Sequence, residues 1–204
     1  MLQIVRPNES SRLRAWLRYP DGVSTPLVSI CCLTYNHVAF IGQALDSFLM
    51  QDTRFPVEVI VHDDASNDGT SEIVAKYAAE RPDVFVVIRQ PENLYSQGVR
   101  AMTMRFMLPR ARGKYIALCE GDDYWTDPKK LQLQVDELEA HPEYAGAFHE
   151  TQQVMPDGTP GRIFGEKAPG LMTAEDTFAR VSPFHTSSLV FRHRVVEFPD
   201  WIAK

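Results

Sequence analysis

The chain has no long apolar run, and its first residues lack the charged and apolar pattern of a secretory signal peptide. A membrane-spanning helix needs roughly 18 or more consecutive apolar residues, and no such run occurs. We therefore expect a cytoplasmic protein without a transmembrane segment. A basic and aromatic segment at residues 12–19 either contacts an anionic membrane surface, such as the inner face of the membrane, or packs as a short arm on its own domain.

The chain also has fewer basic than acidic residues, and its cysteines lack the spacing of a metal site. The 21 Lys and Arg against 27 Asp and Glu give a net charge of −6, which argues against nucleic-acid binding. Cys31, Cys32 and Cys119 fall in apolar strand-like runs, and we expect them to be buried and reduced. The dinucleotide-binding motif Gly-x-Gly-x-x-Gly does not follow the first predicted strand, and a P-loop is absent, which disfavours two common nucleotide-binding classes.

The chain does contain a regular alternation of short apolar runs and helical repeats. The spacing predicts strands at 27–33, 57–62, 84–89 and 115–119, and helices at 38–50, 70–80, 98–110 and from Asp127-Pro128 to about residue 140. This order predicts an α/β fold with a mostly parallel, Rossmann-like sheet flanked by helices.

The pattern changes after residue 143 to mixed structure. Strands are predicted at 144–149 and 187–192, and a capping box at residues 173–176. We therefore expect an irregular leader over residues 1–26, a nucleotide-binding half over 27–142, and the start of a smaller, acceptor-binding half over 143–204.

Acidic residues follow two of the predicted parallel strands. One strand ends at Asp63 and Asp64, and the other is followed by Glu120, Asp122 and Asp123. The carboxyl ends of parallel strands meet at one edge of a sheet, where ligands bind in open α/β folds. Clustered carboxylates repel one another, and a hard divalent cation with phosphate ligands neutralises them. The pattern predicts a site for Mg²⁺ or Mn²⁺ with a phosphate-bearing ligand, and a polar turn is the alternative.

The order and spacing of several segments resemble the family 2 inverting glycosyltransferases, which have the GT-A fold. The segments are Val28–Asn36, His62–Thr70, Asn93 with Gly98, Gly113–Ile116 and Glu120–Asp123, and the resemblance covers roughly residues 26–192. It implies transfer of a sugar, with inversion, from a nucleoside diphosphate sugar to a hydroxyl of a glycan or lipid-linked acceptor. It further implies UDP as the preferred nucleotide, Mn²⁺ or Mg²⁺ as cofactor, and cell-envelope polysaccharide synthesis as the setting.

The resemblance also assigns roles to individual residues. The implied donor-binding residues are Thr34, Tyr35, Asn36, Asp64, Asn93, Glu120 and Asp122, and the implied metal ligands are Asp122 and Asp123. Asp64 would accept a hydrogen bond from the base, as a carboxylate can from the N–H edge of uracil. Glu120-Gly121-Asp122 occupies the family's Asp-x-Asp position, with Glu in place of the first Asp. Weaker assignments are Gln97 and Arg100 near the donor, and Tyr124 and Trp125 as a sugar-facing wall. The alternatives are a solvated helix residue for Arg100 and core packing for the two aromatic residues.

A catalytic base that deprotonates the acceptor hydroxyl is the missing component. In the family it lies beyond a segment similar to residues 184–192, so we expect it beyond Lys204. Within the chain, His149, Glu150 and His185 are alternatives, because histidine and carboxylates are the usual bases. For each of the three, the residue pattern favours a structural role instead: a polar strand end, or a hydrogen-bonded core histidine for His149 and His185.

Two other classes of function stay open. A chain that holds nucleotide-sugar and metal without turnover would be a binding or assembly module, and an incomplete acceptor half would expose apolar surface that favours homo-oligomers. A phosphoryl-accepting receiver domain also gathers acids at parallel strand ends. The sequence marks no phosphoacceptor Asp with a partner Lys, which disfavours the receiver.

Overall fold

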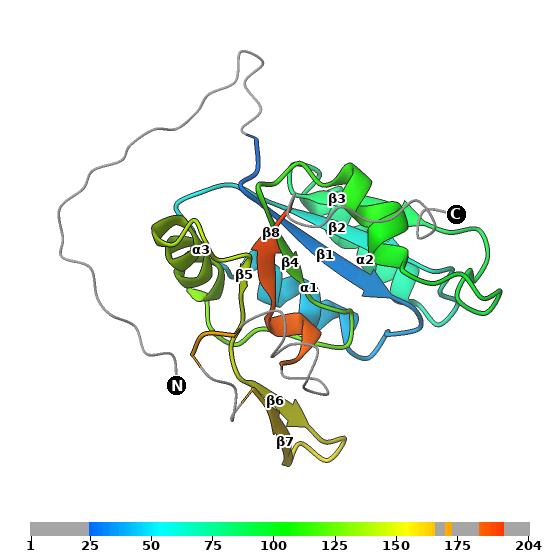
Figure 1. Ribbon diagram of the computed structural model, residues 1–204. Helices are drawn as coiled ribbons and strands as arrows, with labels where there is room; N and C mark the ends of the chain where they lie inside the picture. The colour runs from blue at the N-terminus through cyan, green and yellow to red at the C-terminus, as the bar shows by residue number, and fades with distance from the viewer. Residues whose placement is uncertain (1–24, 166–169, 173–183, 194–204) are drawn as a thin grey trace.

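The computed structural model describes residues 25–165, 170–172 and 184–193 (Figure 1). Nearly all of the predicted leader, including the basic segment at 12–19, lies outside these residues, as does the predicted capping box at 173–176. Among the described helices, none combines the length and apolarity needed to cross a bilayer.

A six-stranded sheet in the order β3-β2-β1-β4-β8-β5 forms the centre of the molecule (Figure 1). Its strands are β1 Val28–Thr34, β2 Val57–Asp63, β3 Phe85–Arg89, β4 Tyr115–Leu118, β5 Gly146–Ala147 and β8 Val190–Arg192. The first four are parallel, whereas β8 runs antiparallel to both β4 and β5. The prediction of a mostly parallel α/β sheet with a mixed C-terminal part is confirmed.

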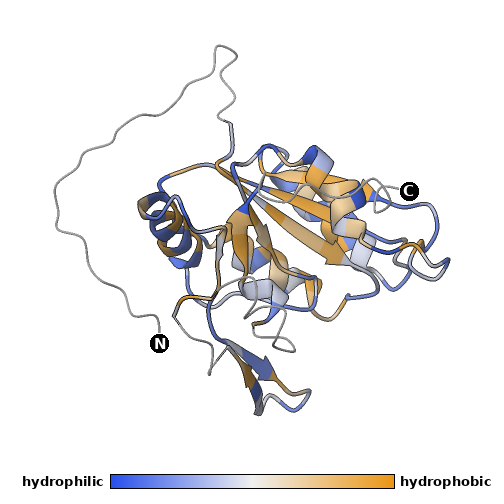
Figure 2. Cartoon of the chain, in the orientation of Figure 1, coloured by the Kyte–Doolittle hydropathy of each residue, from blue (hydrophilic) through white to orange (hydrophobic). Residues whose placement is uncertain are grey.

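The alternation of side chains along each strand separates two apolar cores. On one face, three helices pack against the sheet: α1 Ile41–Leu49, α2 Thr70–Glu80 and α3 Lys130–Ala140. On the other face, Met107 and Leu108 pack against Cys31, Ile60 and Ile116. Figure 2 shows the hydrophobic residues concentrated in the central strands. The three cysteines are buried and unpaired, as predicted.

The helix predicted over 98–110 is shorter and irregular. It consists of a π-helical turn, η1 Thr103–Met107, and a 3-10 turn, η2 Leu108–Arg110. Ala101 has a left-handed φ of 56°, which keeps a right-handed helix from extending back to Gly98. Pro109 has no amide hydrogen and cannot continue the hydrogen-bond ladder. The prediction was wrong because it followed apolar spacing and gave these two positions no weight.

Other element boundaries also differ from the predictions. Helix α3 begins at Lys130, because Asp127 accepts a hydrogen bond from the Lys129 amide (2.8 Å) and closes a separate turn first. Only residues 146–147 of the strand predicted at 144–149 pair in the sheet, and residues 186–188 form a 3-10 turn, η3, rather than strand.

The hairpin of β6 Thr151–Val154 and β7 Pro160–Phe164 projects from the sheet (Figure 1).

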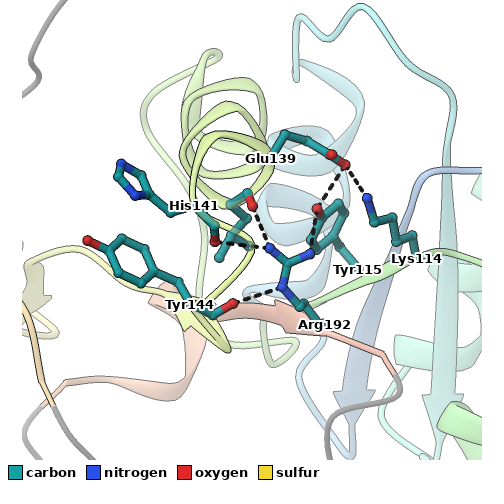
Figure 3. A network of polar contacts seen from close by, with 7 residues as sticks. Lys114, Tyr115, Glu139, His141, Tyr144 and Arg192 are labelled. Carbon is teal, nitrogen blue, oxygen red and sulfur yellow. Dashed lines mark hydrogen bonds and ion pairs between the residues drawn. The ribbon is translucent and has the colours of Figure 1, made fainter.

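Arg192 attaches the C-terminal strand β8 to helix α3 and strand β4 (Figure 3). Its guanidinium donates to the Tyr144 carbonyl (2.8 Å), to the Tyr115 hydroxyl (3.1 Å) and to two carbonyls at the end of α3. The Tyr115 hydroxyl donates in turn to Glu139 (2.8 Å), which also pairs with Lys114. Because β8 is antiparallel to β4, this attachment brings the residues before β8 to the carboxyl end of β4.

Candidate functional site

The carboxyl ends of β1, β2 and β4 meet at one edge of the sheet, as the sequence predicted. Thr34 at the end of β1 pairs in register with Asp63 of β2, and the Asp64 amide donates to the Thr34 carbonyl (3.0 Å). On the other side of β1, the Gly121 amide donates to the Leu33 carbonyl (2.9 Å). The two acidic segments therefore lie on either side of the end of β1.

Glu120, Asp122 and Asp123 form a compact carboxylate cluster just beyond β4. Each offers one carboxylate oxygen, and these oxygens all lie within 4.8 Å of one another. Burial, followed by the charges of Asp122 and Asp123, raises the pKa of Glu120. Burial also raises the pKa of Asp123, against the opposing charge of His185. A hard cation with oxygen ligands relieves such repulsion, so this donor set fits Mn²⁺ or Mg²⁺.

Gly121 allows the backbone of the cluster to lie directly against the end of β1. A Cβ at this position would lie 2.6 Å from Thr34 Oγ1 and 3.0 Å from His37 Nδ1. The Thr34 hydroxyl is itself buried and has no hydrogen-bond partner among the described residues. Only glycine permits this close approach, so residue 121 fixes the distance between the carboxylates and the β1 loop.

Two histidines flank the carboxylate cluster. His185 Nδ1 lies 3.5 Å from Asp123 Oδ2, and His37 Nε2 lies 3.9 Å from Asp122 Oδ2. The same His185 nitrogen is 2.8 Å from Ser187 Oγ. His185 was considered in the sequence only as a base, and His37 and Ser187 were missed. The position of His37, three residues after Thr34 at a predicted ligand-binding edge, was the available signal.

Asp64 anchors the loop that follows β3. Its side chain is 2% exposed, and its two carboxylate oxygens accept hydrogen bonds from the amides of Leu94 (2.9 Å) and Tyr95 (3.0 Å). Asn93 accepts a hydrogen bond from the Ser96 amide (2.6 Å) within the same loop. The contact of Asp64 with a base stays a prediction, and it would have to share a carboxylate that already holds two amides.

A cavity of about 390 Å³ lies beside Asp64, at the carboxyl ends of β2 and β3. It is lined by Ala65, Ser66, Arg89, Gln90 and Pro91. The cavity is open to solvent, and it follows Asp64 directly in the chain without Asp64 lining it. A cavity of this size falls in the range of small-ligand pockets.

The three predicted donor-binding residues at the end of β1 have different environments. Thr34 is buried, whereas Tyr35 is 41% exposed. Asn36 has a left-handed φ of 54° and links two loops, because its side chain accepts from the Asn67 amide and its own amide donates to Ser66 Oγ (both 2.9 Å). Tyr35 therefore offers an aromatic surface at the edge of the sheet, and Asn36 has a structural contact there.

The residues with weaker assignments also differ in burial and contacts. Trp125 is buried and packs on Phe48, with ring centroids 5.0 Å apart, whereas Tyr124 is exposed. Gln97 is exposed on the Asp64-anchored loop, and the Arg100 guanidinium stacks on the Tyr95 ring at 4.0 Å. His149 Nδ1 contacts the Glu150 carbonyl (2.7 Å). Burial, and then the charge of Lys130, lowers the pKa of His149.

Comparison with known proteins identifies relatives over most of the chain. Residues 29–197 match the family model Glycosyl transferase family 2. An uncharacterized protein of Mycobacterium bovis is 41% identical over 167 residues, which are 82% of this chain and 47% of that protein. EpsE of Bacillus subtilis, which carries the name "putative glycosyltransferase", is 36% identical over 121 residues, which are 59% of this chain and 41% of EpsE.

Solved structures share the fold. TarS 1–349 of S. aureus matches with a TM-score of 0.60 and 27% identity over 81% of this chain and 47% of that fragment. The mannosyltransferase PcManGT of Pyrobaculum calidifontis, in complex with GDP-Man and Mn²⁺, has a TM-score of 0.57 at 23% identity, over 88% of this chain and 48% of that one. The chain thus spans about half the length of the relatives it matches. It has the GT-A fold and belongs to glycosyl transferase family 2.

Proposed function

We propose that this chain forms the donor-binding part of a metal-dependent, inverting glycosyltransferase. The donor is a nucleoside diphosphate sugar, with UDP preferred, and the acceptor is a hydroxyl of a glycan or lipid-linked molecule on the cytoplasmic side of a membrane. In this proposal, residues 27–142 bind the nucleotide-sugar and residues 143–204 begin the acceptor-binding half. Contact of the chain with the membrane surface is part of the same proposal. Related structures support the choice of donor, because TarS has been solved with UDP and with UDP-GlcNAc, and PcManGT with GDP-Man and Mn²⁺.

The observation that carries the proposal is the carboxylate cluster of Glu120, Asp122 and Asp123 at the carboxyl edge of the sheet. Asp122 and Asp123 would hold Mn²⁺ or Mg²⁺, with Glu120 completing the charge of the site. A bound divalent cation supplies Lewis-acid stabilisation of the charge that develops on a leaving diphosphate. The chain's own residues hold the donor at this edge. The exposed Tyr35 and the cavity beside Asp64 receive the nucleoside. Gly121 sets the distance between these nucleoside-binding residues and the carboxylate cluster that faces the diphosphate.

A second candidate is a module that binds nucleotide-sugar without transferring it. The contacts of the two candidate histidine bases favour this candidate. His149 Nδ1 faces the Glu150 carbonyl, and His185 lies against Asp123 and Ser187. The other ring nitrogen of His149, Nε2, is buried, so neither nitrogen of His149 is placed to deprotonate an acceptor hydroxyl.

Calorimetric titration of UDP, first with Mn²⁺ and then with EDTA, tests the proposal. We expect binding that depends on the metal, and Asp123→Ala should abolish that dependence while the fold stays intact. Asp83→Ala is the matched control, because Asp83 is exposed and pairs only with the neighbouring Arg81 among the contacts described. Unchanged Mn²⁺ dependence in Asp123→Ala would contradict the metal site. Failure of the native chain to bind UDP, GDP and dTDP would contradict the proposed function, and binding without sugar transfer would favour the second candidate.

A further inference from the structure

Lys130, the first residue of α3, is a buried lysine with no obvious structural use. Its side chain is 5% exposed, and its Nζ has no hydrogen-bond partner among the described residues. Burial lowers the pKa of Lys130 to about 7. Buried charges are normally paired, because an unpaired ammonium loses its hydration without compensation. A residue that costs stability in this way indicates a functional demand on its position.

The ammonium group of Lys130 contacts one aromatic ring. Its Nζ lies 4.0 Å from the centroid of the Trp125 ring, which is the geometry of a cation–π interaction. Phe48 packs against the same ring, and the indole Nε1 of Trp125 donates a hydrogen bond to the Ser187 carbonyl (2.8 Å). Trp125 is therefore held by Lys130 and Phe48, and it holds the 3-10 turn η3.

The turn η3 carries these contacts to the carboxylate cluster. Ser187 Oγ lies 2.8 Å from His185 Nδ1, and that nitrogen lies 3.5 Å from Asp123 Oδ2. Helix α3 holds the turn a second time, because Gln134 Nε2 donates to the Ser188 carbonyl (2.9 Å). A continuous set of contacts thus connects Lys130 with the side chain of Asp123.

We propose that Lys130 is a positioning residue for the metal site: it fixes Trp125, and Trp125 holds the turn at residues 185–188 against Asp123. This inference rests on the proposed function, since the role of Asp123 as a metal ligand is part of it. Lys130 does not touch the carboxylates in this arrangement. Through Trp125 it fixes the positions of His185 and Ser187, and these two residues in turn favour one orientation of the Asp123 carboxylate.

The test compares Lys130→Met with Lys129→Met in the full chain. Methionine keeps the length of lysine without its charge, and Lys129 is a neighbouring, half-exposed lysine that pairs with Asp52. Three measurements are made: hydrogen exchange of the Trp125 indole N–H by NMR, Mn²⁺ affinity without nucleotide by EPR, and thermal unfolding. Trp125→Phe assigns the indole signal among the three tryptophans.

In Lys130→Met we expect faster indole exchange and an unchanged or higher Tm. We expect Mn²⁺ affinity to weaken several-fold, with about 30-fold as the upper bound set by loss of a desolvated cation–π contact. Lys129→Met should leave all three unchanged. Native-like exchange and Mn²⁺ affinity in Lys130→Met would overturn the inference, and so would a lower Tm, which would indicate a general structural role. If the native chain binds neither Mn²⁺ nor nucleotide, the proposed function fails, whereas indole exchange still decides whether Lys130 holds Trp125.

Discussion

Replacement of Gly121 by alanine tests whether the close approach of the carboxylate cluster to β1 is required. An added Cβ would lie 2.6 Å from Thr34 Oγ1, 2.8 Å from Thr34 Cβ and 3.0 Å from His37 Nδ1. To reach an ordinary contact of 3.4 Å, Thr34 Oγ1 and residue 121 would have to separate by about 0.8 Å. Thr34 is buried at the end of a central strand, so it cannot move freely, and we expect the acidic loop to shift.

The expected cost has two parts. Overpacking of this kind typically destabilises a protein by about 1–3 kcal/mol, and in a chain of this size each kcal/mol lowers the Tm by roughly 2–4 °C. A functional constellation tolerates displacements of about 0.5 Å, and the required shift exceeds that limit. We therefore also expect Mn²⁺-dependent UDP affinity to fall by about tenfold, which corresponds to about 1.4 kcal/mol.

Thermal unfolding and calorimetry on Gly121→Ala and Gly42→Ala measure both parts. Gly42 is a matched control, because it lies in helix α1 and an added Cβ there meets no atom within 4 Å. Alanine in a helix is favoured over glycine by up to about 1 kcal/mol, so Gly42→Ala should keep or raise the Tm and bind UDP normally. If Gly121→Ala had native stability and native Mn²⁺-dependent affinity, the cluster would not depend on its distance from Thr34.

Two further predictions concern buried ionisable groups. Asp64→Asn places an amide NH₂ against one of the N–H groups of Leu94 and Tyr95, a mismatch of about 1–3 kcal/mol, so hydrogen exchange at both amides should accelerate together with any loss of UDP affinity. Loss of UDP affinity with native exchange would instead support direct contact of Asp64 with the base. The pKa of Lys130 falls from 10.5 to about 7 on folding, so between these pH values the unfolded chain binds more protons than the folded chain. The free energy of unfolding should therefore rise with pH, by at most about 5 kcal/mol across this window. Lys130→Met should abolish that rise in chemical denaturation series at pH 7 to 10, and an identical rise in the variant would refute the burial of the ammonium group.

Much of the sheet followed from local sequence signals. The segments that form β1, β2, β3 and β4 are apolar and bounded by polar turns. Each pairs in parallel with another of these four predicted strands. The edge position of the acids followed as well, because strand direction alone determines which ends of parallel strands meet. Boundaries were less certain where single residues decide them, as Ala101 and Pro109 do in the segment before β4.

The contacts of the candidate site could not be derived in the same way. The partners of Asp64 are amides some 30 residues away, and His185 reaches Asp123 only because β8 returns antiparallel to β4. Lys130 is the clearest case, since lysine near the start of a helix is ordinarily exposed. Its Nζ lies over the ring of Trp125, for which the sequence left a sugar-facing wall and core packing as alternatives.

The return of β8 therefore has a consequence for how the two halves of the chain depend on each other. The carboxylates belong to the loop after β4, but the groups nearest Asp123 include His185 from the segment before β8. Arg192 fastens β8 to Tyr115 of β4 and to α3, and Lys130 and Gln134 of α3 hold the turn beside Asp123 through Trp125 and Ser188. Helix α3 thus contacts both the turn beside Asp123 and the strand β8 that follows this turn. A change that loosens α3 should disturb Asp123 before it disturbs Asp64, because the loop at Asp64 is anchored by its own amides.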